Sequence, residues 1–139
     1  FWTPLAAGSA GAFGLKDDCA AIAPPPGCDL VVTTDGLIEG VHFFPGEAAG
    51  AIAWKALAVN VSDLAAKGAE PIGYLLSLSV APWCGDDWLE RFAAGLAEDQ
   101  ALYGIDLLGG LMVVVKAFSV APLETFKGWW GAWWSRGQQ

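Results

Sequence analysis

The segment from Ile52 to Lys67 constrains this chain most, because it has the apolar pattern of a buried helix and yet contains polar residues. Its apolar positions are filled in with alanines, and Gly68 follows as a helix stop. Asn60, Asp63 and Lys67 are spaced by three and four, so they share one stripe of the helix. A carboxylate buried in such a helix needs a cation or several hydrogen-bond donors. We therefore expect a metal or phosphate site here rather than a solvated surface.

Two further carboxylates flank predicted strands. Asp35 follows the strand predicted for Asp29 to Thr34, in which a run of Leu, Val and Val indicates burial. Asp18 precedes another strand, predicted for Cys19 to Ala23. Carboxylates from separated elements, with threonine hydroxyls beside one of them, are the hard oxygen ligands that Mg²⁺ accepts. We predict that Asp35 and Asp63 lie close enough to share a cation.

Each carboxylate also has a purely structural interpretation. Asp17 or Asp18 could make a turn, Asp35 could cap the loop that follows it, and Asp63 could pair with Lys67. For any one of them alone, this interpretation is the better one. Taken together they favour a site, because Asp63 would need a partner inside an apolar helix face.

His42 is the only histidine, and it stands between apolar and aromatic residues in GVHFF. A lone histidine in such surroundings is more often packed and hydrogen-bonded than bound to a ligand, so the residues alone favour core packing. The G-x-S-x-G pattern of acyl transfer is absent, and so are the common glycine-rich phosphate-binding motifs. If ATP binds here, it binds without a P-loop.

The remaining segments predict an α+β fold. Pro24 to Gly27 is a turn, Ile72 to Val80 a strand, Asp86 to Tyr103 a helix capped by Asp86 or Asp87, and Ile105 to Leu108 a strand. The order strand, strand, helix, strand, helix, strand predicts a mixed or antiparallel sheet with helices packed on one face. The second helix is expected to turn four charged residues toward water: Glu90, Arg91, Glu98 and Asp99.

Composition excludes several classes of function. The net charge of −8 argues against a nucleic-acid surface, and no apolar stretch is long enough for a membrane span. The hydrophobic content of 55% suggests that apolar surface meets another subunit or domain. Three widely spaced cysteines indicate neither a disulfide framework nor a zinc site, so we expect a reducing, cytoplasmic setting.

The chain divides into three parts by composition. Residues 1–16 are rich in glycine and alanine and are expected to form an irregular lead-in, and residues 17–110 form the predicted domain. Residues 111–139 contain no Asp, one Glu and half of the eight tryptophans. This abrupt shift suggests a segment foreign to the ancestral fold, as after a change of reading frame or in a truncated gene prediction.

Five blocks within residues 11–110 resemble the thiamine-monophosphate kinase family, which belongs to the superfamily of aminoimidazole ribonucleotide synthetase and selenophosphate synthetase. They are LKDDCA (15–20), VVTTDGLIEGVHF (31–43), WKALAVNVSDLAAKGAEP (54–71), YLLSLSV (74–80) and YGIDLLGG (103–110). The resemblance implies the N-terminal domain of the aminoimidazole ribonucleotide synthetase-like fold. It also implies an ATP-dependent kinase that makes thiamine diphosphate from thiamine monophosphate by direct transfer through several Mg²⁺ ions.

The resemblance assigns roles by position: Asp18, Thr33, Thr34, Asp35 and Asp63 to Mg²⁺, His42 to the substrate, and Tyr103 and Gly110 to ATP. Family members place Asp-Thr after the Gly-Gly pair, where this chain has Leu111 and Met112. We expect the resemblance to end after Gly110 and the family's C-terminal domain to be absent, so that this chain alone is inactive. The alternative is a non-catalytic module that dimerises through its sheet, and the kinase itself is expected to be a homodimer.

Overall fold

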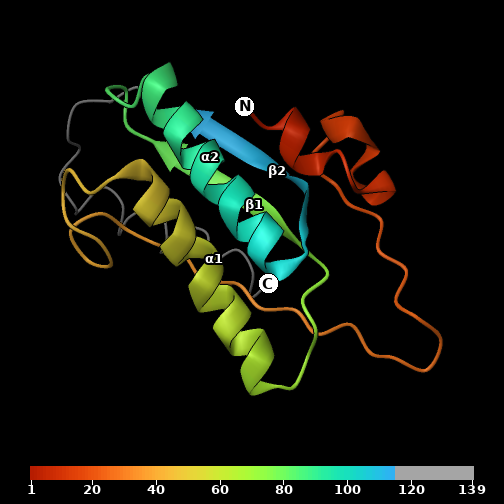
Figure 1. Ribbon diagram of the computed structural model, residues 1–139. Coiled ribbons are helices and arrows are strands. Elements are labelled where there is room, and N and C mark those ends of the chain that lie inside the picture. The colour runs from red at the N-terminus through yellow and green to blue at the C-terminus, as the bar shows by residue number, and fades with distance from the viewer. Residues whose placement is uncertain (115–139) are drawn as a thin grey trace, which may run out of the picture.

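The computed structural model describes the backbone of residues 1–114 and the side chains of residues 1–110. Most of the predicted Trp-rich tail, residues 115–139, lies outside the described residues. The elements in chain order are η1 (Thr3–Ala6), η2 (Ala10–Leu15), α1 (Ala49–Ala66), β1 (Gly73–Val80), α2 (Asp86–Tyr103) and β2 (Asp106–Val114), where η denotes a 3-10 helix. In Figure 1, α2 lies in front of the two strands, α1 lies beside α2, and the 3-10 helices lie beside β2.

Both predicted α-helices are confirmed. α1 begins at Ala49 and ends at Ala66, close to the predicted bounds. α2 ends at Tyr103, and Gly104 follows in the left-handed conformation with φ +67°, which glycine adopts without strain. The predicted aspartate cap is wrong, because Gly85 is the N-cap and no side chain caps the helix. Asp86 and Asp87 lie in the first turn instead, where their negative charges interact favourably with the positive end of the helix dipole.

The described sheet has two parallel strands, so the predicted mixed or antiparallel sheet is wrong for this part of the chain. Its register runs from Gly73 opposite Asp106 to Val80 opposite Val114, with an irregularity between Tyr74 and Leu75. The physical reason lies in the connection. A long helix between two neighbouring strands returns the chain to its starting edge, which makes the strands parallel.

The strands predicted for Cys19 to Ala23 and Asp29 to Thr34 are also not formed. Both segments lack regular secondary structure, and within residues 1–114 neither has the ladder of hydrogen bonds to a neighbour that a strand requires. The apolar run of the second segment is exposed, with Val32 at 78%. The turn between them is confirmed, because the Cys28 N–H donates to the carbonyl of Pro25 at 3.1 Å.

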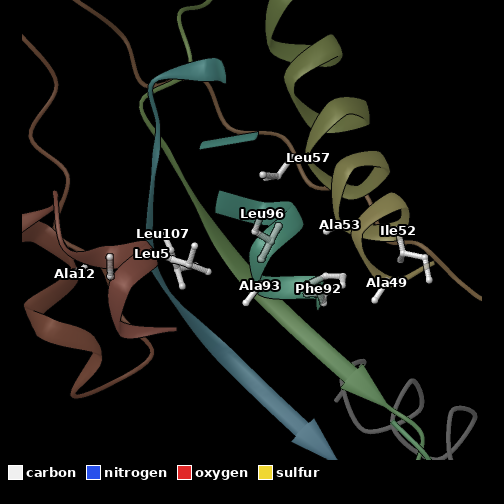
Figure 2. Close-up of a cluster of buried hydrophobic side chains, with 11 residues drawn as sticks. Leu5, Ala12, Ala49, Ile52, Ala53, Leu57, Phe92, Ala93, Leu96 and Leu107 are labelled. Carbon is white, nitrogen blue, oxygen red and sulfur yellow. The ribbon is translucent and has the colours of Figure 1, made fainter. Parts of the chain in front are cut away.

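The core lies between the helix pair and the sheet, as the labelled side chains in Figure 2 show. Both α-helices contribute to it, and Leu96 of α2 is fully buried. At the crossing of the helices, a Cβ atom on Gly95 would lie 2.8 Å from the Cα of Gly50, so the close approach requires glycine. Segment 1–16, expected to be irregular, forms the 3-10 helices and adds three residues to the core: Leu5, Ala6 and Ala12.

Both α-helices lie on one face of the sheet, as predicted, and leave the other face uncovered by them (Figure 1). Along β1 the exposed and less exposed side chains alternate, and Leu75 on the far face is 60% exposed. Among the helices of the described residues, none is long and apolar enough to cross a bilayer.

Candidate functional site

Helix α1 holds the segment that contains Thr33 and Asp35. The Thr33 hydroxyl donates a hydrogen bond of 3.3 Å to Oδ2 of Asp63, thirty positions later in the chain. The Asp35 backbone N–H donates to Oδ1 of Asn60 at 2.9 Å. Since Asn60 and Asp63 are three positions apart on one helix, both bonds fix the segment to the same stripe of α1. The structure therefore brings together residues that the sequence singled out separately.

The environment of these carboxylates differs from the prediction. Asp35 and Asp63 are exposed in the described structure, so the expectation that an apolar helix face buries Asp63 is wrong. The reason is that α1 turns its apolar side to α2 and the core, and the stripe with Asp63 lies outside that contact. The alternative of an ion pair with Lys67 is not formed within the described residues, where Asp63 accepts the Thr33 hydroxyl instead.

The oxygen atoms at this stripe suit a hard cation. Mg²⁺ is commonly held by one or two carboxylates and keeps several waters or phosphate oxygens. Asp35 and Asp63, with the hydroxyls of Thr33 and Thr34, offer such donors with open space around them. Within residues 1–110, however, no three carboxylate, histidine or cysteine side chains are close enough to hold one ion, so Asp18 is not gathered with the other two carboxylates. A shared cation at Asp35 and Asp63 stays a prediction.

Asp18 lies at a different place, against β2. A Cβ atom on Gly109 would lie 2.9 Å from the carbonyl oxygen of Asp18, so the chain around Asp18 packs directly on this strand. The neighbouring Asp17 accepts the Cys19 N–H through Oδ1 at 2.9 Å, which is the turn-forming role that the structural interpretation gave to this pair. Gly110 follows with φ +137° and lies against the backbone of Leu76, where a side chain would not fit.

His42 is exposed, so the prediction of core packing is wrong. Its Nδ1 accepts the Ile38 N–H at 3.0 Å, and its backbone carbonyl accepts a bond from the Lys55 ammonium of α1. Because Nδ1 is an acceptor, the proton of the neutral ring is on Nε2. His42 therefore presents an N–H donor to the solvent. Tyr103, the expected nucleotide contact, is half-buried at the end of α2.

Asp99 is a buried charged residue that the sequence placed in water, and its side chain is only 3% exposed. Its Oδ2 atom has no hydrogen-bond partner in the described structure. Burial raises the pKa of this carboxyl, and the negative charge of Glu98 raises it further. The signal was available in the spacing, since Phe92, Leu96 and Asp99 follow one another by four and three and share the core face.

Asp99 also lines a shallow groove of about 520 Å³ between α1 and α2, together with Trp54 and Arg91. Beneath the helices, Gln100 donates to the Tyr74 hydroxyl at 3.2 Å and to the Leu5 carbonyl at 2.8 Å. Burial raises the pKa of Tyr74, which keeps this hydroxyl neutral. These groups tie α2 to β1 and η1 and lie apart from the residues on the Asp63 stripe.

Comparisons with known proteins agree on the relationships of this chain. The model of the AIR synthase related protein family, N-terminal domain, matches residues 16–124. The thiamine-monophosphate kinase of Caulobacter vibrioides is 46% identical over 126 residues, which are 91% of this chain and 36% of that protein. The Escherichia coli K12 thiamine-monophosphate kinase is 42% identical over 97 residues, 70% of this chain and 30% of that protein.

Among solved structures, the crystal structure of thiamine-monophosphate kinase from Stenotrophomonas maltophilia K279a superposes with a TM-score of 0.62 at 41% identity. This match covers 71% of this chain and 31% of that one. The chain thus spans about a third of the length of the relatives it matches. The family match ends at residue 124, and an alignment over 126 residues must include some beyond Gly110. Resemblance therefore continues past the point where the sequence motifs placed its end.

Proposed function

Since this chain belongs to the AIR synthase related family through its N-terminal domain, we propose that it forms the metal- and nucleotide-binding part of a thiamine-monophosphate kinase. The reaction would transfer the terminal phosphoryl group of ATP to thiamine monophosphate, giving thiamine diphosphate and ADP. The observation that best supports this proposal is the pairing of Thr33 with Asp63 and of Asp35 with Asn60 on α1. It places hydroxyl and carboxylate oxygens of two distant segments on one exposed surface.

In this proposal Asp35 and Asp63, with Thr33 and Thr34, hold Mg²⁺ against the phosphates. The ions would neutralise charge on the transferred group and align donor with acceptor, which is the main requirement of phosphoryl transfer. Asp18 would serve a separate ion, because it lies beside Gly109 rather than beside the other carboxylates.

The substrate contacts follow from the positions of three further residues. Gly110 and Tyr103 would contact ATP, near the strand on which Asp18 packs. His42 would donate its Nε2 proton to an oxygen of thiamine monophosphate, since Nδ1 is already occupied by the Ile38 N–H. A cytoplasmic location belongs to the same proposal, and it is supported by Cys19, Cys28 and Cys84, which are all free thiols.

The test uses a chimera, because this chain spans about a third of its relatives. The aligned residues up to Gly110 would replace the corresponding part of the C. vibrioides kinase, so that the chimera keeps that enzyme's own residues after the Gly-Gly pair. ADP release would be followed with thiamine monophosphate as acceptor. We expect activity that falls by at least about a hundredfold with Asp63→Asn, as for loss of a group that stabilises developing charge. Glu70→Gln, an exposed change of equal charge just beyond α1, is the control and should leave activity unchanged.

The chain by itself is expected to show no turnover in the same assay. Loss of the groups that align the acceptor can reduce a rate by several powers of ten. Turnover by the isolated chain that depends on both thiamine monophosphate and Asp63 would contradict this part of the proposal. An active chimera that is insensitive to Asp63→Asn would contradict the assignment of the metal ligand.

A second candidate function is a module that self-associates through its sheet, and it is compatible with the first as a homodimeric kinase. Its support is that large apolar residues are exposed, among them Leu75 on the sheet at 60% and, outside it, Val32 at 78% and Phe44 at 82%. Sedimentation velocity of the chain tests it. Leu75→Lys should shift a dimer toward monomer, whereas a monomeric wild-type chain would contradict this function.

A further inference from the structure

The Asn60 side chain donates one hydrogen bond and accepts another. Its Nδ2 group donates to the carbonyl of Ala56, one turn earlier in α1, at 2.9 Å. This bond fixes the orientation of the amide, so that Oδ1 points to the Asp35 N–H and accepts it at 2.9 Å. Asn60 is half-buried, and it therefore links the rigid helix to an exposed segment that has no regular secondary structure.

The segment is attached to the rest of the fold at few described points, one of which is Leu37, packed against the core. Residues 29–37 form no helix and no strand, and Asp35 itself is exposed. The second attachment near Asp35 is the Thr33 hydroxyl on Asp63, at 3.3 Å. Beyond this segment, the Lys55 ammonium holds the carbonyl of His42, which is a separate attachment of the chain to α1.

We propose that Asn60 is a positioning residue that holds the Asp35 backbone on the stripe of α1 that carries Asp63, so that the Asp35 carboxylate is available there for cation binding. The role of the cation rests on the proposed function, while the anchoring itself rests on the two hydrogen bonds of Asn60. Groups that orient a metal ligand without touching the metal typically change metal affinity by about 10- to 100-fold when removed. A carboxylate on an unanchored segment would have to be ordered at the moment of binding.

The first arm of the test measures anchoring in the full chain. Hydrogen exchange of the Asp35 amide would be followed by NMR in the wild type and in Asn60→Ala. Loss of one such hydrogen bond should speed the exchange roughly two- to tenfold. Asn60→Asp keeps an oxygen acceptor but loses the donor to the Ala56 carbonyl, so its exchange rate should lie between those of the wild type and Asn60→Ala. Ser62→Ala, an exposed neighbour on α1, is the matched control and should leave the exchange rate unchanged.

The second arm measures cation affinity with Mn²⁺ as the probe, by the EPR signal of the free ion. We expect Asn60→Ala to weaken Mn²⁺ binding about 10- to 100-fold, whereas Asn60→Asp should bind at least as tightly as the wild type. Lys55→Met removes the distant anchor and should leave Asp35 exchange unchanged. An equal effect of Lys55→Met would mean general loosening of the segment and would overturn the specific role of Asn60.

The outcomes separate this inference from the proposed function. Unchanged exchange at Asp35 in Asn60→Ala overturns the anchoring, and faster exchange with unchanged Mn²⁺ affinity overturns the positioning of a cation ligand. A wild-type chain that does not bind Mn²⁺ contradicts the proposed function. In that case the hydrogen exchange of the Asp35 amide alone tests whether Asn60 anchors the segment. Native dispersion of the amide spectrum in Asn60→Ala confirms that the variant is folded.

Discussion

Replacing Asp99 by asparagine should stabilise the fold at neutral pH. The residue is 3% exposed and its Oδ2 atom has no hydrogen-bond partner among the described residues, so ionisation places charge on a buried oxygen that nothing there compensates. A buried polar group without a partner typically costs about 1 to 3 kcal/mol. Asparagine has the same shape and no charge but still has a polar amide to satisfy. We therefore expect Asp99→Asn to increase the free energy of unfolding at pH 7 by about 1 kcal/mol.

The pH dependence distinguishes charge from packing. Burial raises the pKa of folded Asp99 above the value of 3.8 for an unperturbed aspartate. The folded state therefore binds more protons than the unfolded state between these two pKa values, and stability falls as pH rises through that range. Below the unfolded pKa both states are protonated and the penalty vanishes. The advantage of Asp99→Asn should thus be present near pH 7 and absent near about pH 3.

Urea unfolding followed by tryptophan fluorescence, at both pH values, measures this difference. Glu90→Gln is the control, because it removes an equal charge from an exposed position on the same helix that does not act on the Asp99 carboxyl. It should change the unfolding free energy by less than about 0.5 kcal/mol. The reasoning would be refuted if Asp99→Asn were no more stable than the wild type at pH 7. It would also be refuted if the gain in unfolding free energy were the same at both pH values.

Two further substitutions test the core and the sheet. Leu96→Ala should lower the unfolding free energy by about 2 to 5 kcal/mol, because Leu96 is fully buried. Leu102→Ala, at a position that is 69% exposed, should change it by less than about 0.5 kcal/mol. Equal effects of the two substitutions in urea unfolding would contradict the described core. Gly110→Ala should cost about 2 kcal/mol or more, since φ is +137° and a Cβ would overlap the Leu76 backbone, and an unchanged thermal midpoint would contradict that geometry.

The helices and the turn could be predicted from the sequence because their causes are local. The apolar spacing and glycine stops of α1 and α2 lie within each segment, and the prolines before Gly27 exclude a strand there. Local residue types also identified Thr33, Asp35 and Asp63 as chemically unusual. The family relationship was visible in the same short blocks and is confirmed by the comparisons.

Pairing and burial were decided only in three dimensions, because they depend on which segments meet. The run before Thr33 is apolar enough for a buried strand, yet within the described residues no neighbouring strand pairs with it. The spacing of Asp99 after Phe92 and Leu96 puts it on the inner face of α2, but only the packing of that face shows that a charged residue is buried there. Asp63 is the reverse case: an apolar helix suggested burial, and the packing of α1 leaves it in solvent beside Thr33. Residue type fixes what a side chain can do, whereas its surroundings depend on contacts between distant segments.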